Sequence, residues 1–223
     1  MSSLGDRLGG SGLYFLSWLA SKSGRFQLNG EAYFQEALDS GKPIIFAAWH
    51  GMTMMLVGLF RTRLDLSDIV LILPDDWRGT TLIIFAEKLG AHPFPMNLEG
   101  GEPMATARRI AQLVKQVKAG KHCYITPDGP FGPAYTMKPG LTYIAQKAGA
   151  LILPIGAYAR HGYRLPRWDR YIVPYPFSRI SVEIGEPIVV EKGADLTAVN
   201  HTLAQTLNRV TLQAAANYYE KQL

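Results

Sequence analysis

A histidine stands where a strongly apolar segment of this 223-residue chain ends. The run 43–48 reads Pro-Ile-Ile-Phe-Ala-Ala, and Trp49, His50 and Gly51 follow it directly. In α/β enzymes, binding and catalytic side chains gather where buried strands end. A neutral imidazole, with an ordinary pKa near 6.5, can take a proton from a hydroxyl group and pass it on. His50 is therefore the first candidate for a general base.

A second polar loop follows another apolar segment, 123–126. Residues 126–133 read Thr-Pro-Asp-Gly-Pro-Phe-Gly-Pro, and Lys138 comes shortly after them. Two glycines and three prolines indicate a rigid loop whose N–H groups, together with Lys138, could hold an anion or polarise a carbonyl. The alternative is a structural turn in which Asp128 caps its own loop. The functional interpretation gains weight because His50 is expected at the same sheet edge.

Short apolar runs rich in β-branched residues alternate with helical patterns, which is typical of an α/β fold with a largely parallel sheet. Strands are expected at 44–50, 69–73, 93–96, 123–126, 151–157, 171–173 and 180–190, the last two antiparallel or at an edge. Helices are expected at 81–89, 104–118, 141–148 and 196–223. Length and composition predict a single domain with a mostly parallel sheet flanked by helices.

Composition and charge exclude few classes of binding partner. Lysine plus arginine exceed aspartate plus glutamate by 23 to 18, a net charge of +5 that is compatible with an anionic membrane surface, an acidic cofactor or nucleic acid. The single cysteine, Cys123, excludes an intrachain disulfide and is expected in a strand core. The histidines have no metal-ligand spacing, so no metal is expected. Nucleic acid is not expected as a partner, because no recognised binding motif is present.

The N-terminal segment 1–30 is treated separately from the domain expected at 31–223. Its apolar stretch 13–20 is too short to span a bilayer, which needs about 20 apolar residues. It is interpreted either as an amphipathic anchor on the membrane surface or as an ordinary helix docked on the domain.

Several segments together resemble the lysophospholipid acyltransferase-like superfamily, in particular a bacterial branch formerly catalogued as a domain of unknown function. The matching segments cover most of 44–190 in the family's order: 49–51, 126–133, 138–140, 153–155, 168–171 and 174–179. The resemblance implies a glycerolipid acyltransferase-like fold. It also implies acyl transfer from acyl-coenzyme A or acyl carrier protein to a hydroxyl of a membrane lipid, in phospholipid metabolism, with no permanently bound cofactor.

The resemblance assigns roles to residues of this chain. His50 is the implied base, Asp128 orients it or shapes the site, and Gly129 and Gly132 provide oxyanion or acyl-donor contacts. Lys138 and Arg170 are implied to hold anionic groups of the substrates. No Gly-x-Ser-x-Gly elbow occurs, which favours direct transfer over an acyl-enzyme.

The chain also departs from the superfamily. The fifth position after the histidine, where the superfamily has an aspartate that orients the ring, is Met55. The candidates for the orienting acid are Asp128, then Asp75 or Asp76 after the strand at 69–73. The superfamily's acceptor-binding arginine is missing from the loop at 127–131, and Asn97 is only a partial substitute for the polar residues expected after Gly90. These departures weaken the case for a glycerol-phosphate acceptor.

Three hypotheses follow from the sequence. The first is a peripheral O-acyltransferase on the cytoplasmic face of the inner membrane. The others are a non-catalytic lipid-binding protein on the same fold and a hydrolase of acyl esters or thioesters. Met52, Met54 and Met55 either line an acyl channel or, as the favoured interpretation, pack beneath the next helix. The sequence does not define the oligomeric state.

Overall fold

A computed structural model describes residues 2–97 and 102–220. Its main sheet has the order β1-β9-β6-β2-β5-β3-β4, with β10 paired to β6 outside this path. The strands are β1 (Arg25–Asn29), β2 (Ile44–Ala47), β3 (Ile69–Pro74), β4 (His92–Met96), β5 (His122–Ile125), β6 (Leu151–Tyr158), β9 (Arg179–Ile184) and β10 (Ile188–Val189). The helices are α1 (Leu4–Ser23), α2 (Glu31–Asp39), α3 (Thr53–Arg63), α4 (Trp77–Leu89), α5 (Pro103–Lys118), α6 (Gly140–Ala148) and α7 (Leu196–Glu220).

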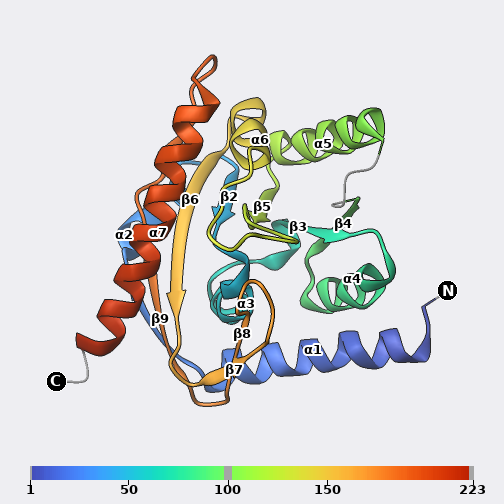
Figure 1. Cartoon of the computed structure of the whole chain (residues 1–223), viewed down its shortest axis with the longest axis vertical. Helices are drawn as coiled ribbons and strands as arrows, with labels where there is room; N and C mark the ends of the chain where they lie inside the picture. Colours follow the sequence, from blue (N-terminus) through green and yellow to red (C-terminus); the bar gives the residue numbers. More distant parts are fainter. Residues whose placement is uncertain (1, 98–101, 221–223) are drawn as a thin grey trace.

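Most pairs in the sheet are parallel, as the alternating pattern predicts. The strands β6, β2, β5, β3 and β4 run parallel to one another, while β9 is antiparallel to β6. Helix α7 packs along β6 and β9, and α1 lies across α3 and α4 (Figure 1). The segment at 44–49 is completely buried because both faces of the central sheet are covered. The fold prediction of one α/β domain is confirmed.

The predicted strands after residue 170 are arranged differently. The strand at 171–173 corresponds to β8 (Ile172–Pro174), which leaves the main sheet and forms a hairpin with β7 (Gly162–Arg164). The strand at 180–190 is divided into β9 and β10, and β9 lies inside the sheet between β1 and β6. The hairpin matters for function because the connection between β7 and β8 returns to the loop after β2.

Helix α1 begins with a capping box in which Ser3 and Asp6 satisfy each other's backbone N–H groups. It packs closely on α4, since a Cβ added at Gly10 would lie 2.8 Å from Ile84. Within the described residues, no helix has the length and apolar character needed to cross a membrane. After α1, β1 pairs with β9, so part of the segment 1–30 belongs to the sheet of the domain. The anchoring role of this segment stays a prediction.

Candidate active site

Two loops meet at the carboxyl edge of the sheet. Ala47 of β2 and Ile125 of β5 are directly paired in the parallel ladder. His50 and Asp128 each lie three residues beyond their strand, so the matched register brings the two loops together. The sequence predicts this meeting, and the structure brings the two residues into contact.

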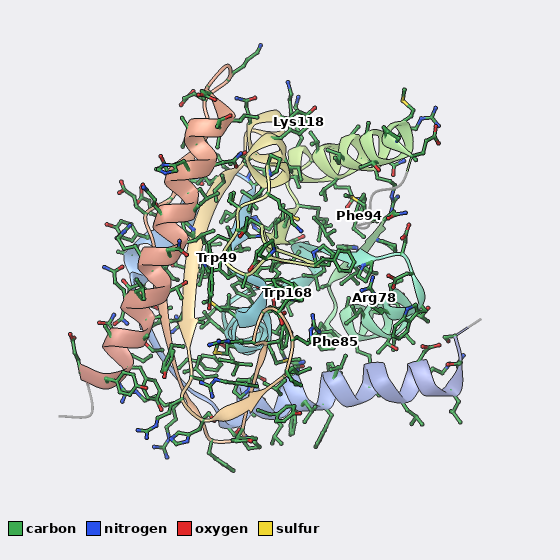
Figure 2. All side chains as sticks on the ribbon, viewed as in Figure 1. Trp49, Arg78, Phe85, Phe94, Lys118 and Trp168 are labelled. Carbon is green, nitrogen blue, oxygen red and sulfur yellow. The ribbon has the colours of Figure 1, made fainter. Side chains whose placement is uncertain are left out.

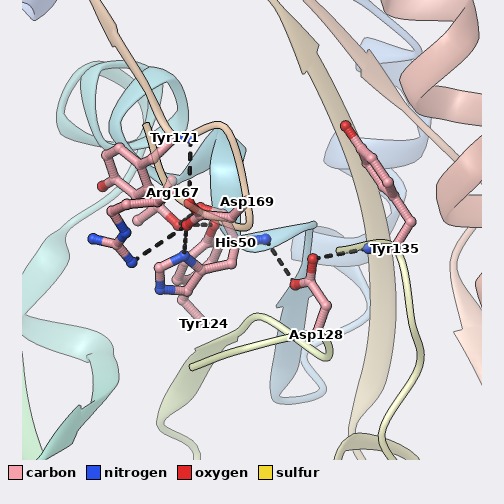
Figure 3. A network of polar contacts seen from close by, with 8 residues as sticks. His50, Tyr124, Asp128, Tyr135, Arg167, Asp169 and Tyr171 are labelled. Atoms are coloured by element: carbon pink, nitrogen blue, oxygen red, sulfur yellow. Dashed lines mark hydrogen bonds and ion pairs between the residues drawn. The ribbon is translucent and has the colours of Figure 1, made fainter. Parts of the chain in front are cut away.

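Asp128 holds the backbone of the site. Its Oδ1 accepts a hydrogen bond of 2.8 Å from the backbone N–H of His50, and its Oδ2 accepts one of 3.2 Å from the N–H of Tyr135. Burial of the carboxyl raises the pKa of Asp128 above its usual range, and these two hydrogen bonds act in the opposite direction. Figure 3 shows that the carboxylate faces the main chain of the histidine turn, the short 3-10 helix His50–Met52. Asp128 therefore shapes the site by holding the backbone of His50. It does not orient the imidazole ring, which was the alternative role.

The acid that contacts the imidazole is Asp169. Its Oδ2 lies 2.6 Å from Nδ1 of His50, and its side chain is completely buried (Figure 3). The same carboxylate accepts hydrogen bonds from the backbone N–H of Tyr171 at 3.3 Å and from Nη2 of Arg167 at 3.4 Å. A carboxylate at Nδ1 favours the tautomer that carries its proton there, which leaves the Nε2 lone pair available as a base.

The predictions of Asp75 and Asp76 as orienting acids are wrong. Asp75 is exposed at the end of β3. Asp76 caps the N-terminus of α4 and pairs with Arg78. Residues 168–171 contributed to the family resemblance, yet the sequence does not reveal that Asp169 is the partner of His50. The two residues are 119 positions apart, and a hairpin outside the main sheet brings them together.

The loop that carries Asp169 packs tightly on the two other loops. A Cβ added at Gly51 would collide with the backbone oxygen of Asp169, and one at Gly132 would lie 2.6 Å from the indole of Trp168. The ring of His50 lies 5.4 Å from that of Trp168 and 5.6 Å from that of Tyr171. Figure 2 places Trp168 near the middle of the molecule. Because Gly51 and Gly132 have no side chains, the loop can pack closely enough for Asp169 to reach the imidazole of His50.

Hydroxyl groups extend the network on the other side of His50. Oγ1 of Thr53 donates to the backbone oxygen of His50 at 2.9 Å and lies 3.1 Å from the hydroxyl of Tyr124. Burial raises the pKa of Tyr124, so its hydroxyl stays neutral at physiological pH. Together with Asp128, these contacts fix the position of the histidine turn.

The glycine N–H groups of the second loop are already engaged. Gly129 donates to the backbone oxygen of Thr126 at 3.1 Å, and Gly132 donates to that of Asp128 at 3.0 Å. A tight turn uses both N–H donors internally, while Gly129 lines the cavity described next, so the predicted oxyanion or acyl-donor role of the two glycines stays a prediction. Nζ of Lys138, in contrast, donates to the backbone oxygen of Gly129 at 2.9 Å and lines the cavity described next.

A cavity of about 910 Å³ opens beside His50. Its volume is at the upper end of the range of about 300–1,000 Å³ that is usual for ligand sites. The lining is mostly apolar and comes from the segments around β3, β4 and β5 and from helices α3, α4, α5 and α6. Met54 lines the cavity, whereas Met52 and Met55 belong to the buried core, so the favoured packing interpretation holds for these two methionines.

The two predicted substrate-binding residues lie in different places. Asn97 lines the cavity, as its predicted role requires. Arg170 is exposed, adopts a left-handed backbone with φ of 46°, and does not line the cavity. The arginine that lines the cavity and contacts Asp169 is Arg167. The turn from Arg167 to Arg170 determines which of the two faces the site.

Other titratable residues have structural roles. Nδ1 of His122 accepts the backbone N–H of Ile44, and burial lowers the pKa of this histidine. Burial raises the pKa of the Cys123 thiol to about 12, which makes it a poor nucleophile. In the part of the chain that the structure describes, no three His, Cys, Asp or Glu side chains are grouped so as to hold a metal. The expectations of no metal and no cofactor stay predictions.

Comparisons with known proteins show what the chain is similar to. No family model matches the chain. A protein of Rickettsia prowazekii (strain Madrid E), named only as uncharacterized protein RP090, is 26% identical over 147 residues, which are 66% of this chain and 64% of that protein. The crystal structure of the 1-acyl-sn-glycerophosphate (LPA) acyltransferase PlsC from Thermotoga maritima superposes with a TM-score of 0.59 at 15% identity, over 92% of this chain and 79% of that one. The chain therefore has an acyltransferase-like α/β fold.

Proposed function

We propose that the protein is a membrane-peripheral O-acyltransferase that moves an acyl chain from acyl-coenzyme A or acyl carrier protein to a hydroxyl of a lipid acceptor. The observation that carries the proposal is the His50–Asp169 pair beside a large, mostly apolar cavity. This combination supplies a base for a hydroxyl group and space for a hydrocarbon chain in the same site. The fold shared with an acyltransferase supports the same conclusion.

The reaction needs one base and no redox partner. Nε2 of His50 takes the proton of the acceptor hydroxyl while its oxygen attacks the thioester carbonyl carbon. The tetrahedral intermediate collapses, the carbon–sulfur bond breaks, and the imidazolium returns the proton to the leaving thiolate. Asp169 keeps the ring in the required tautomer and stabilises the imidazolium as it forms.

Lys138 provides positive charge near the reacting atoms. A Cβ at Gly129 would lie 3.0 Å from Cδ2 of His50, and the Lys138 ammonium is bound to the carbonyl of this glycine. A cation held beside the base can stabilise the oxyanion of the intermediate or an anionic group of the donor. The engaged N–H groups of Gly129 and Gly132 make Lys138 the better candidate.

The cavity favours direct transfer to the acceptor. None of the described residues that line it is a serine or a cysteine, and Cys123 is buried in the core. Met96 of β4 lines the cavity, and β4 lies about 14 Å from β2, because three strand spacings separate the two strands. An acyl chain can extend in this direction while its thioester stays beside His50.

The proposed place of action is the cytoplasmic face of the inner membrane. Helix α1 exposes apolar side chains at Leu4, Leu8, Phe15 and Trp18. The same helix contributes Leu13 to the cavity lining, and α4 contributes Trp77, whose side chain is 84% exposed. An apolar helix face beside a cavity lining fits a lipid acceptor that enters from the bilayer.

The test follows a labelled acyl group through the reaction. Purified protein is mixed with acyl-coenzyme A or acyl carrier protein and with vesicles of bacterial lipids, and the products are identified by mass spectrometry. Label in a lipid ester supports the proposal. Free fatty acid without an acceptor product would indicate a hydrolase, and bound lipid without turnover would indicate a lipid-binding protein; either result would overturn the proposal.

A further inference from the structure

The loop between β8 and β9 exposes aromatic side chains, and Phe177 is the more exposed of them. Phe177 is 74% exposed and has a left-handed backbone with φ of 63°. Such a conformation is unfavourable for a bulky residue, and glycine or asparagine would adopt it more easily. The neighbouring Tyr175 is also exposed. The loop therefore presents aromatic surface to solvent at a conformational cost.

The loop is held firmly against the end of α1. The N–H of Phe177 donates to Oγ of Ser23 at 3.0 Å, and the N–H of Arg25 donates to the backbone oxygen of Ser178 at 2.9 Å. Oγ of Ser178 donates to the backbone oxygen of His161 at 2.8 Å, which connects the loop to the start of the β7–β8 hairpin. Phe177 thus lies next to the helix whose outer face is apolar.

The surroundings of the loop are cationic. Residues 158–182 contain five arginines, and their only acid is Asp169, which is buried against His50. Arg160, adjacent to His161, and Arg25 are both exposed. A hollow of about 430 Å³ is lined by Arg25, His161, Tyr175, Phe177, Arg179 and Tyr218. Arginines and aromatic rings around a hollow match the phosphate and the acyl boundary of a phospholipid headgroup.

We propose that Phe177 and the arginines around it form a second membrane contact, which inserts an aromatic side chain and selects anionic phospholipid. The proposal extends the proposed function, because the arginines around Phe177 add a cluster of positive charge to the apolar contact that α1 offers. Two contacts joined through Ser23 would fix the orientation of the protein on the bilayer. In Figure 1, α1 and the β7 end of the hairpin lie along the same lower side of the molecule.

The experiment is vesicle flotation of the purified full chain. Vesicles of phosphatidylcholine are compared with vesicles that also contain phosphatidylglycerol, for the wild type, Phe177→Asn, Phe177→Gly and Arg160→Gln. Controls are Tyr143→Ala, an exposed aromatic on α6, and Lys118→Gln, a cation at the upper edge of the molecule in Figure 2. Wild-type protein is expected to bind the anionic vesicles more strongly.

The expected effects differ between the variants. Both Phe177 substitutions should weaken binding about fivefold or more on either vesicle. Arg160→Gln should weaken vesicle binding about fivefold on anionic vesicles only, since one basic residue near an anionic surface strengthens binding by about that factor. Both Phe177 variants should keep or raise the melting temperature, because they relieve the left-handed strain. The two controls should bind like the wild type.

Equal binding of wild type and Phe177 variants to both vesicles would overturn this inference. A separate binding measurement with acyl carrier protein covers the other outcome: if Arg160→Gln binds this protein more weakly but binds vesicles like the wild type, the inference is also overturned. A lower melting temperature for Phe177→Gly would also count against it, since the aromatic ring would then serve folding. Flotation does not require turnover. Failure of acyl transfer by the wild type would therefore reject the proposed function and not this membrane contact.

Discussion

Nδ1 of His50 lies 2.6 Å from Oδ2 of Asp169, although 119 residues separate them in the chain. The acid arrives on the connection between β7 and β8, which packs on the histidine turn through Gly51. Met55 occupies the position where the superfamily resemblance implies an aspartate. A carboxylate supplied by a distant loop fills the role that the local sequence leaves open.

Asp169→Asn should lower acyl transfer by about 10²–10⁴-fold, because an amide can favour the wrong imidazole tautomer. The measurement is turnover with a fixed donor and acceptor, together with circular dichroism to verify folding. Asp75→Asn is the matched control, since Asp75 is exposed, and its turnover should stay within about twofold of the wild type. Equal losses in both variants would contradict the assignment of Asp169.

Gly51→Ala should reduce activity as well as stability. The added methyl group would collide with the backbone oxygen of Asp169, so the loop must move away from His50. The expected loss in the free energy of unfolding is about 1–3 kcal/mol, measured by urea denaturation. Gly12→Ala on α1, where a Cβ meets nothing within 4 Å, should be neutral or stabilising. Full activity of Gly51→Ala would show that the close approach is unnecessary.

The role of Asp128 can be tested through the pH dependence of stability. Its pKa is raised by burial, so the folded protein holds this proton at a pH where the unfolded chain has released it. Stability contributed by this group therefore falls as the pH rises from the usual value near 3.8 through the raised folded pKa. Asp128→Asn should show a flatter profile in this window. An unchanged profile would contradict the direction of the shift.

The sequence could predict the parallel sheet and the meeting of His50 with Asp128, because both depend on strand ends in a regular ladder. It could not predict that Asp128 binds the backbone of His50, since the direction of a carboxylate depends on three-dimensional loop packing. Nor could it identify Asp169, because β8 leaves the main sheet to form a separate hairpin. Nor could it show that Arg167, and not Arg170, faces the cavity, because this depends on the turn between the two residues.

Substitution within the cavity should change the preference for acyl chain length. Ile110 on α5 lines the cavity, and α5 contacts β4, the edge strand that stands three places from β2 in the sheet order. Ile110→Trp should lower turnover with long-chain donors by about tenfold or more while sparing short-chain donors, because the indole occupies the space of the chain. Ile110→Leu conserves volume and is the control. Equal losses for all donors would argue against an acyl chain in this cavity.

The most direct measurement of the central claim is the acceptor-dependent release of free thiol from the acyl donor, with wild-type protein and His50→Gln compared on the same lipid vesicles. We expect the wild type to release thiol in step with lipid ester formation, and His50→Gln to lose at least about 10²-fold while keeping its fold. Thiol release by His50→Gln at the wild-type rate would contradict the account.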